Sequence, residues 1–280
     1  MTYSIVARDP ETGELGVAVQ SQSFNTGAAV PWARPGVGAI ATQSFTDKRY
    51  GWRGLELLAD GASPDDALRQ LLDEDELPGF RQVGFLAADG RVAQWTGERC
   101  IDAAGHVHGE SWAAQANLVE SPAVWEDMGA AFEAASGSLA QRLLAALDAA
   151  QAAGGDWRGR GGAGIVVVPA EGQPWDRVID LRVEEGDDSL ERLRALVDRA
   201  EGYRSYFRSE DGKSELAERA GLSGQQQLWG PVLDALAADD VESARARYAA
   251  MLTVDPRWAA YARTFDAHPQ LPSLTPLLGD

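Results

Sequence analysis

The chain begins, after Met1, with Thr2-Tyr3-Ser4-Ile5-Val6-Ala7-Arg8-Asp9, and this stretch predicts the first strand of the fold. Ile5 and Ala7 fall on one face of that strand, with Val6 alongside. The residues Asp-Pro-Glu-Thr-Gly at 9–13 then form a turn, and a second apolar run follows at 15–19. Two apolar runs around such a turn are typical of a β-hairpin.

Thr2 is the first candidate for chemistry. It is small enough for Met1 to be trimmed after synthesis, and trimming would leave a hydroxyl and a free amine on one residue. Such a pair can act as nucleophile and base together. The structural alternative stays open, because a threonine can begin a strand without taking part in any reaction.

The composition sets the class of protein. The 280 residues are 45% hydrophobic and 24% charged, which is ordinary for a globular protein. A formal charge of −18 and a pI near 4.5 argue against nucleic acid and anionic membranes as partners, since both would repel the chain. We find no membrane span or signal peptide and expect a cytoplasmic protein. The single cysteine, Cys100, excludes an internal disulfide framework.

The periodicity predicts a layered α+β domain. Strands are expected at 2–9, 15–19, 28–32 and 37–42, followed by helices at 50–59 and 64–72. A hairpin at 81–87 and 91–96, irregular segments at 100–117, helices at 121–134 and 138–152, strands at 163–168 and 175–183, and a helix at 187–206 follow. Hairpins with one face to bury, alternating with helix pairs, favour layers over a parallel, doubly wound sheet.

The rest of the chain reads as helical. The composition turns polar around residues 208–212, which we interpret as a linker between a domain at 1–207 and a helical region at 213–280. Helices are expected at 228–238, 241–252 and 257–265, and an extended proline-rich tail at 269–280. One partial tetratricopeptide-like unit around 240–256 is weak evidence for a repeat, because arrays need several units.

Hydrolysis at Thr2 would need donors that hold an oxyanion. The ends of the strands at 16–23 and 41–45 carry amides and hydroxyls that could supply them. Each of these polar side chains could instead be solvated. The candidate substrate-binding or oxyanion residues are Ser21, Ser23, Gln43, Tyr50, Arg81 and Asn117.

Other kinds of site are disfavoured. Cys100, Asp102, His106 and His108 lie close in sequence, but their spacing matches no standard zinc pattern. No Gly-x-Ser-x-Gly elbow is present, and the glycine-rich run 159–164 precedes a strand, so we interpret it as a turn. We expect no metal and no cofactor.

Several separated motifs resemble one known family. They are residues 2–9, Gly16-Val17-Ala18-Val19, the stretch 31–43, Arg49-Tyr50-Gly51 with Gly54-Leu55, Arg81-Gln82-Val83-Gly84, Thr96-Gly97 with Cys100, Gly105-His106, and Gln115 with Asn117. Together they are similar, over about residues 2–207, to the N-terminal-nucleophile-hydrolase-like family filed as domain of unknown function 1028. The resemblance implies a four-layer αββα sandwich, here with a small C-terminal all-helical appendage.

The resemblance also implies a chemistry. Proteasome-like relatives assist the threonine with a carboxylate and a lysine, whereas this chain has Gln22 and Ser23 on that strand and only Lys48 as a stand-in. The leading hypothesis is therefore an amidohydrolase that cleaves a small linear amide through an acyl-enzyme on Thr2. A homodimer is a possible assembly of the chain. The alternative is a non-catalytic scaffold whose helical tail recruits a partner.

Overall fold

The computed structural model describes residues 2–208, 212–222, 227–267 and 273–278. The contacts divide the chain into two compact units, Met1–Val197 and Asp198–Asp280. Most of the predicted linker, residues 209–211, lies outside the described residues, so the domain bounds stay a prediction. None of the described helices is long and apolar enough to cross a membrane.

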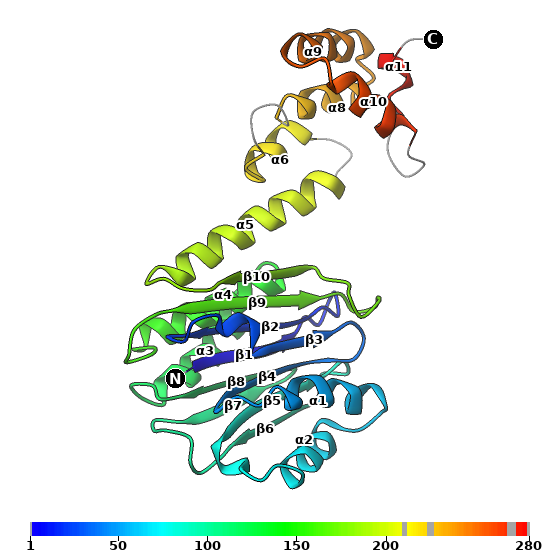
Figure 1. Cartoon of the computed structure of the whole chain (residues 1–280). Helices are drawn as coiled ribbons and strands as arrows, with labels where there is room; N and C mark the ends of the chain where they lie inside the picture. Colours follow the sequence, from blue (N-terminus) through cyan, green and yellow to red (C-terminus); the bar gives the residue numbers. More distant parts are fainter. Residues whose placement is uncertain (1, 209–211, 223–226, 268–272, 279–280) are drawn as a thin grey trace. The chain divides into compact units, whose positions relative to one another are not determined.

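Ten strands form two antiparallel sheets in the first unit (Figure 1). The strands are β1 (Thr2–Arg8), β2 (Leu15–Ser21), β3 (Pro31–Arg34), β4 (Gly38–Ser44), β5 (Arg81–Ala87), β6 (Val92–Thr96), β7 (Gly105–Gly109), β8 (Trp112–Asn117), β9 (Gly162–Val168) and β10 (Ile179–Val183). The larger sheet has the order β10-β9-β2-β1-β8-β7 and the smaller one β3-β4-β5-β6. The first strand of the chain is thus central in the larger sheet.

Alternation along the strands gives each sheet two buried faces. Val6 and Val17 of the larger sheet share an apolar cluster with Ala39 and Leu86 of the smaller one, so the two sheets face each other. Because successive side chains of β1 point in opposite directions, Tyr3, Ile5 and Ala7 belong to a different cluster on the outer face.

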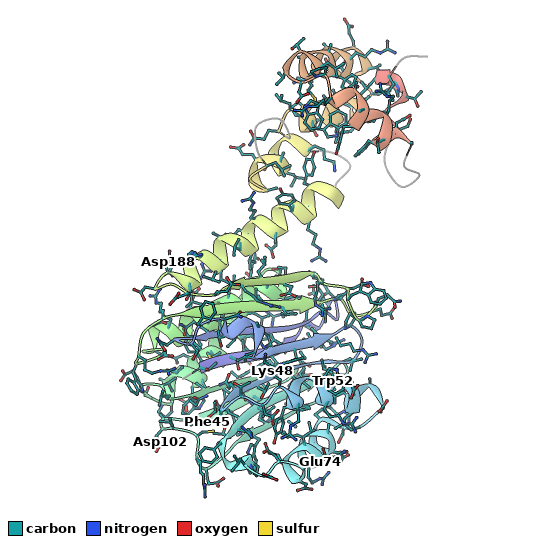
Figure 2. The ribbon with its side chains drawn as sticks, viewed as in Figure 1. Phe45, Lys48, Trp52, Glu74, Asp102 and Asp188 are labelled. Atoms are coloured by element: carbon teal, nitrogen blue, oxygen red, sulfur yellow. The ribbon has the colours of Figure 1, made fainter. Side chains whose placement is uncertain are left out.

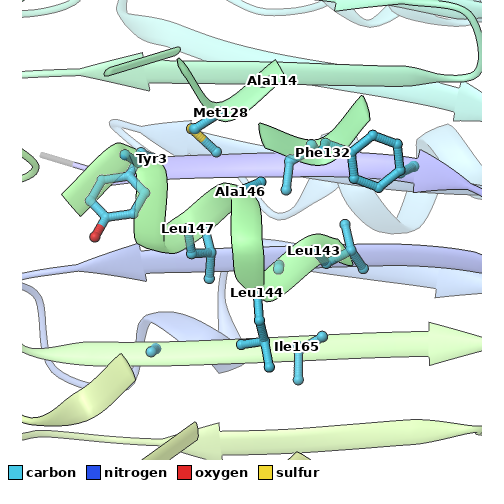
Figure 3. Close-up of a cluster of buried hydrophobic side chains, with 14 of the residues drawn as sticks. Tyr3, Ala114, Met128, Phe132, Leu143, Leu144, Ala146, Leu147 and Ile165 are labelled. Carbon is cyan, nitrogen blue, oxygen red and sulfur yellow. The ribbon is translucent and has the colours of Figure 1, made fainter. Parts of the chain in front are cut away.

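Helices cover both outer faces. The helices α3 (Ala123–Ala134) and α4 (Leu139–Ala152), with the first residues of α5 (Ser189–Arg208), share the core of the larger sheet. Figure 3 shows part of this core, including Met128, Leu143 and Ile165. The helices α1 (Arg49–Ala59) and α2 (Pro64–Asp73) cover the smaller sheet and share a core with Phe85 of β5.

The predicted α+β class with antiparallel hairpins is confirmed, but three segments differ from the prediction. The strand predicted at 28–32 begins only at Pro31, because a 3₁₀-helix, η1 (Thr26–Ala28), occupies its predicted start. A second 3₁₀-helix, η2 (Pro78–Phe80), precedes β5. The strand predicted from 175 begins at Ile179. The segment 100–117, predicted as irregular, contains β7 and β8, and β8 pairs directly with β1.

The second unit is helical in its described part. It contains α6 (Lys213–Arg219), α8 (Trp229–Ala237), α9 (Val241–Val254), α10 (Trp258–Asp266) and α11 (Thr275–Leu278). Trp229, Tyr248 and Leu277 share its main core, so this unit has an apolar interior of its own. The extended tail predicted at 269–280 is wrong over Thr275–Leu278, because Leu277 is buried in that core as part of a helix. The tetratricopeptide-like character stays a prediction.

Candidate active site

The space between the two sheets becomes polar near the start of β1. Ser4 Oγ donates to Gln43 Oε1 over 2.6 Å, and Gln43 Nε2 donates to Gln82 Oε1 over 2.7 Å. Asn117 Nδ2 donates to the same Gln82 oxygen over 2.8 Å. All four side chains are buried, and buried polar groups that bond to one another hold a defined geometry. The strands therefore meet in a rigid polar network at this end.

Thr2 is fixed by that network through its backbone and by β2 through its side chain. Its carbonyl oxygen accepts a hydrogen bond from Gln43 Nε2 over 3.0 Å. Its hydroxyl Oγ1 donates to Ser21 Oγ over 3.1 Å, and Ser21 Oγ also accepts the Ser23 backbone N–H over 3.1 Å. The hydroxyl of Thr2 is thus oriented by a serine that is itself held in place.

A pocket of about 270 Å³ opens at Thr2. Its wall combines a polar part with apolar side chains, of which Phe24, Phe45 and Ile101 are largely exposed (Figure 2 labels Phe45). The lining residues are Thr2, Ser23, Phe24, Thr26, Ala29, Val30, Ser44, Phe45, Thr46, Ile101, Asn117, Leu118 and Arg158. The volume lies just below the range of about 300–1,000 Å³ that is common for small-molecule sites, which indicates a small ligand.

Two strands change direction where they reach the pocket. Ser44, at the end of β4, has φ 69°, and Leu118, directly after β8, has φ 59°. Residues other than glycine seldom adopt this left-handed conformation. Both residues line the pocket, so its wall depends on backbone turns that the rest of the structure holds in place.

A buried carboxylate holds Arg158, another residue that lines the pocket. Asp156 accepts the Gln22 backbone N–H over 2.8 Å and forms an ion pair with Arg158 at 3.3 Å. A Cβ on Gly161 would lie 2.1 Å from the Gln22 oxygen, so only glycine allows this close approach. Arg158 lines the pocket. Sequence reasoning missed Asp156 and Arg158 because it took the glycine-rich run beside them for a plain turn.

Comparison with known proteins identifies the family. A family of unknown function, DUF1028, matches residues 2–193. The chain belongs to this family. A crystal structure of the DUF1028 protein SPO2555 from Silicibacter pomeroyi is similar over 76% of this chain and 96% of that one, with 30% sequence identity and a TM-score of 0.68. The comparison with curated proteins found no match.

The DUF1028 match covers the whole pocket, since every lining residue falls between Thr2 and Arg158. Of the predicted site residues, Ser23 and Asn117 line the pocket with Thr2. Ser21 and Gln43 lie behind it, each in contact with Thr2. The amide nitrogen of Gln43 donates to the Thr2 carbonyl and to Gln82, so this side chain positions Thr2.

Two of the predicted site residues, Tyr50 and Arg81, lie in a separate cluster and do not line the pocket. Tyr50 Oη donates to Asp75 Oδ2 over 3.0 Å, and Arg81 Nε donates to the same oxygen over 2.7 Å. The hydrogen bond from Arg81 lowers the pKa of Asp75 to about 2, and burial raises the pKa of Tyr50. Arg81 still reaches the pocket indirectly, because its Nη1 donates to the carbonyl oxygen of Phe45 over 2.6 Å. Lys48, also marked in Figure 2, is exposed and does not line the pocket.

Two of the residues weighed for a metal site, Cys100 and His106, make other contacts. Cys100 Sγ donates to the Arg81 carbonyl oxygen over 3.3 Å, and His106 Nδ1 lies 2.8 Å from Thr96 Oγ1. Burial lowers the pKa of His106, which favours its neutral form. In the part of the chain that the structure describes, no three His, Cys, Asp or Glu side chains gather as metal ligands would.

Proposed function

We propose that the first unit is the four-layer αββα sandwich of N-terminal nucleophile hydrolases and that the chain is an amidohydrolase acting on a small amide. The arrangement of two facing sheets, each covered by helices on its outer side, supports the fold assignment. One observation carries the activity. Thr2 begins the central strand β1 and lines a pocket, and its hydroxyl is bonded to Ser21.

The reaction follows from these positions. Cleavage of the Met1–Thr2 bond would place a free amine on the residue that bears the hydroxyl. Thr2 Oγ1 attacks the amide carbon, its proton passes to the α-amine, and the C–N bond breaks as the leaving amine takes that proton. Water then hydrolyses the ester on Thr2. Ser21 orients the hydroxyl, and Asn117 is the side-chain amide that lines the pocket beside it.

The first experiment is an intact-mass measurement of the purified full chain. Met1 lies outside the described residues, so its removal stays a prediction. We expect a chain that begins at Thr2. Retention of Met1 would block the amine and favour the alternative, a non-catalytic scaffold whose helical region recruits a partner.

The second experiment measures turnover. A screen of small amides, ureido compounds and acylated amino acids supplies the substrate. Thr2→Ala should fold normally and lose at least about a thousandfold in kcat, because no acyl-enzyme can form, whereas Thr2→Ser should keep part of the activity. Thr12→Ala, in the exposed turn after β1, is the matched control and should retain full activity. Wild-type turnover by Thr2→Ala would place the active site elsewhere.

A further inference from the structure

The charge of the pocket wall points to one class of substrate. We propose that the amide bound at Thr2 carries a carboxylate group and that Arg158 binds this carboxylate. The inference rests on the proposed function for the position of the scissile amide. The anion site itself requires only the pocket and Arg158, so it can be tested without turnover.

Acidic residues are missing from this wall although they dominate the chain. The sequence holds 43 Asp and Glu residues against 25 Lys and Arg. Among the described residues that line the pocket, none is Asp or Glu, and Arg158 is the one that carries a charge. A chain with a net charge of −18 repels anions at a distance, so a pocket wall whose one charged lining side chain is a cation is a local exception. The pocket therefore selects for a negative group.

The guanidinium of Arg158 is held in place for such a contact. Asp156 is buried and accepts from Arg158 through the backbone N–H at 2.9 Å and the side chain at 3.3 Å. The same carboxylate is anchored to the end of β2 through the Gln22 N–H. The Arg158 side chain remains 31% exposed. A guanidinium fixed in this way loses little freedom on binding and matches the planar geometry of a carboxylate.

The charge balance favours a carboxylate over a phosphate. Asp156 already offsets part of the Arg158 charge, and the described lining residues supply no second cationic side chain. A phosphate monoester carries close to two negative charges at pH 7, and one of them would lack a side-chain partner. A carboxylate carries one.

The remaining wall suits an apolar group on the same molecule. Phe24, Phe45 and Ile101 contribute exposed apolar side chains to the wall, and Val30 and Leu118 contribute buried ones. Together with the volume of about 270 Å³, these contacts fit a small N-acylated amino acid, which combines an amide, a carboxylate and an apolar part.

The test uses matched ligand pairs and measures binding by calorimetry. The protein is the full chain carrying Thr2→Ala, which cannot turn the ligands over. The pairs are N-acetylphenylalanine, N-acetylleucine and N-acetylglycine, each against its C-terminal carboxamide, with inorganic phosphate and acetate as competitors. We expect at least one carboxylate to bind about tenfold or more tightly than its carboxamide. Acetate should compete better than phosphate.

Arginine variants in the same background assign the effect to a residue. Arg158→Gln should remove the preference for the carboxylate, and Arg158→Lys should keep part of it because the charge remains. Arg160→Gln is the matched control, since Arg160 is 32% exposed, pairs with Glu191 and does not line the pocket. Arg160→Gln should prefer the carboxylate over the carboxamide as strongly as the Thr2→Ala chain does. Thermal melting of each variant verifies that it folds.

The outcomes are separable from those of the proposed function. The anion site is overturned if no pair shows a carboxylate preference, if folded Arg158→Gln keeps it, or if phosphate competes better than acetate. Carboxylate binding that depends on Arg158, in a wild-type chain that hydrolyses nothing, would sustain the anion site and reject the hydrolase. If turnover depends on Thr2 but carboxylates and carboxamides bind equally well, the hydrolase is sustained and the anion site is rejected.

Discussion

Gln43 Nε2 on β4 donates to the carbonyl oxygen of Thr2 on β1 over 3.0 Å, and this bond joins the two sheets where the pocket opens. The same nitrogen donates to Gln82, and Gln43 Oε1 accepts from Ser4. One buried amide therefore helps to join the two sheets and to position Thr2, a residue that lines the pocket.

Replacing that amide should cost stability. Gln43→Leu has a similar volume but leaves the Thr2 oxygen without this donor inside the protein. We expect a loss of about 2–3 kcal/mol in the free energy of unfolding, measured by urea denaturation. Gln173→Leu, at an exposed position, is the control and should change the value by less than about 0.5 kcal/mol. Equal effects of the two substitutions would show that the Gln43 bond is energetically unimportant.

The ion pair of Asp75 with Arg81 should make stability depend on pH. The folded-state pKa of Asp75 is about 2, below its ordinary value of 3.8. Its stabilisation is therefore complete above pH 3.8 and is lost as the pH falls through about 2. Asp75→Asn should lower the free energy of unfolding by about 2 kcal/mol at pH 7, with the difference shrinking below pH 4.

A control for that pH dependence exists on the surface. Asp89 pairs with Arg91, and both side chains are more than half exposed. Asp89→Asn should have a much smaller effect at every pH, since water screens an exposed pair. A pH-independent loss in Asp75→Asn would mean that packing, and not charge, accounts for its effect.

The first unit should fold without the helical region. The clusters that bury its sheets use residues up to Val197, while the helices that follow have clusters of their own. Deleting residues 213–280 should leave one cooperative thermal transition, followed by circular dichroism. Deleting 184–280 is the contrasting variant, because it also removes Leu190, Leu193 and Val197 from the core of the larger sheet. It should melt at a clearly lower temperature, and a gradual transition in the first variant would contradict the prediction.

Local patterns predicted the hairpins and helices well. The helices α2 and α4 lie where the periodicity predicted them, and the side chains of Ser63 and Ser138 cap their first turns. The strand β8 was missed because Trp-Ala-Ala-Gln-Ala-Asn has few of the β-branched residues that mark strands. Ala114 and Ala116 are buried in the core that helices cover, and Ala113 is buried between the two sheets, so their burial depends on residues far along the chain.

The candidate site was predictable only where its residues are close in sequence or lie on paired strands. Thr2, Ser21 and Ser23 are near in sequence or on paired strands, so hairpin reasoning places them together. Tyr50 and Arg81 carry suitable groups, but their partner is Asp75, which sequence reasoning had not considered. Arg158 reaches the pocket through Asp156 and the Gln22 backbone, a contact across more than 130 residues that leaves no local pattern.

The left-handed turns at Ser44 and Leu118 lie where β4 and β8 end, so they shape the pocket wall at the ends of the paired strands. Both residues line the pocket, and the conformation of each turn is a property of the main chain. Glycine or asparagine adopts this conformation more easily than serine or leucine, and β-branched residues adopt it least. Replacing Ser44 by another small or polar residue should therefore reshape the pocket wall and leave the pairing of β1 with β2 and β8 unchanged, whereas Leu118 is also part of the core of the larger sheet.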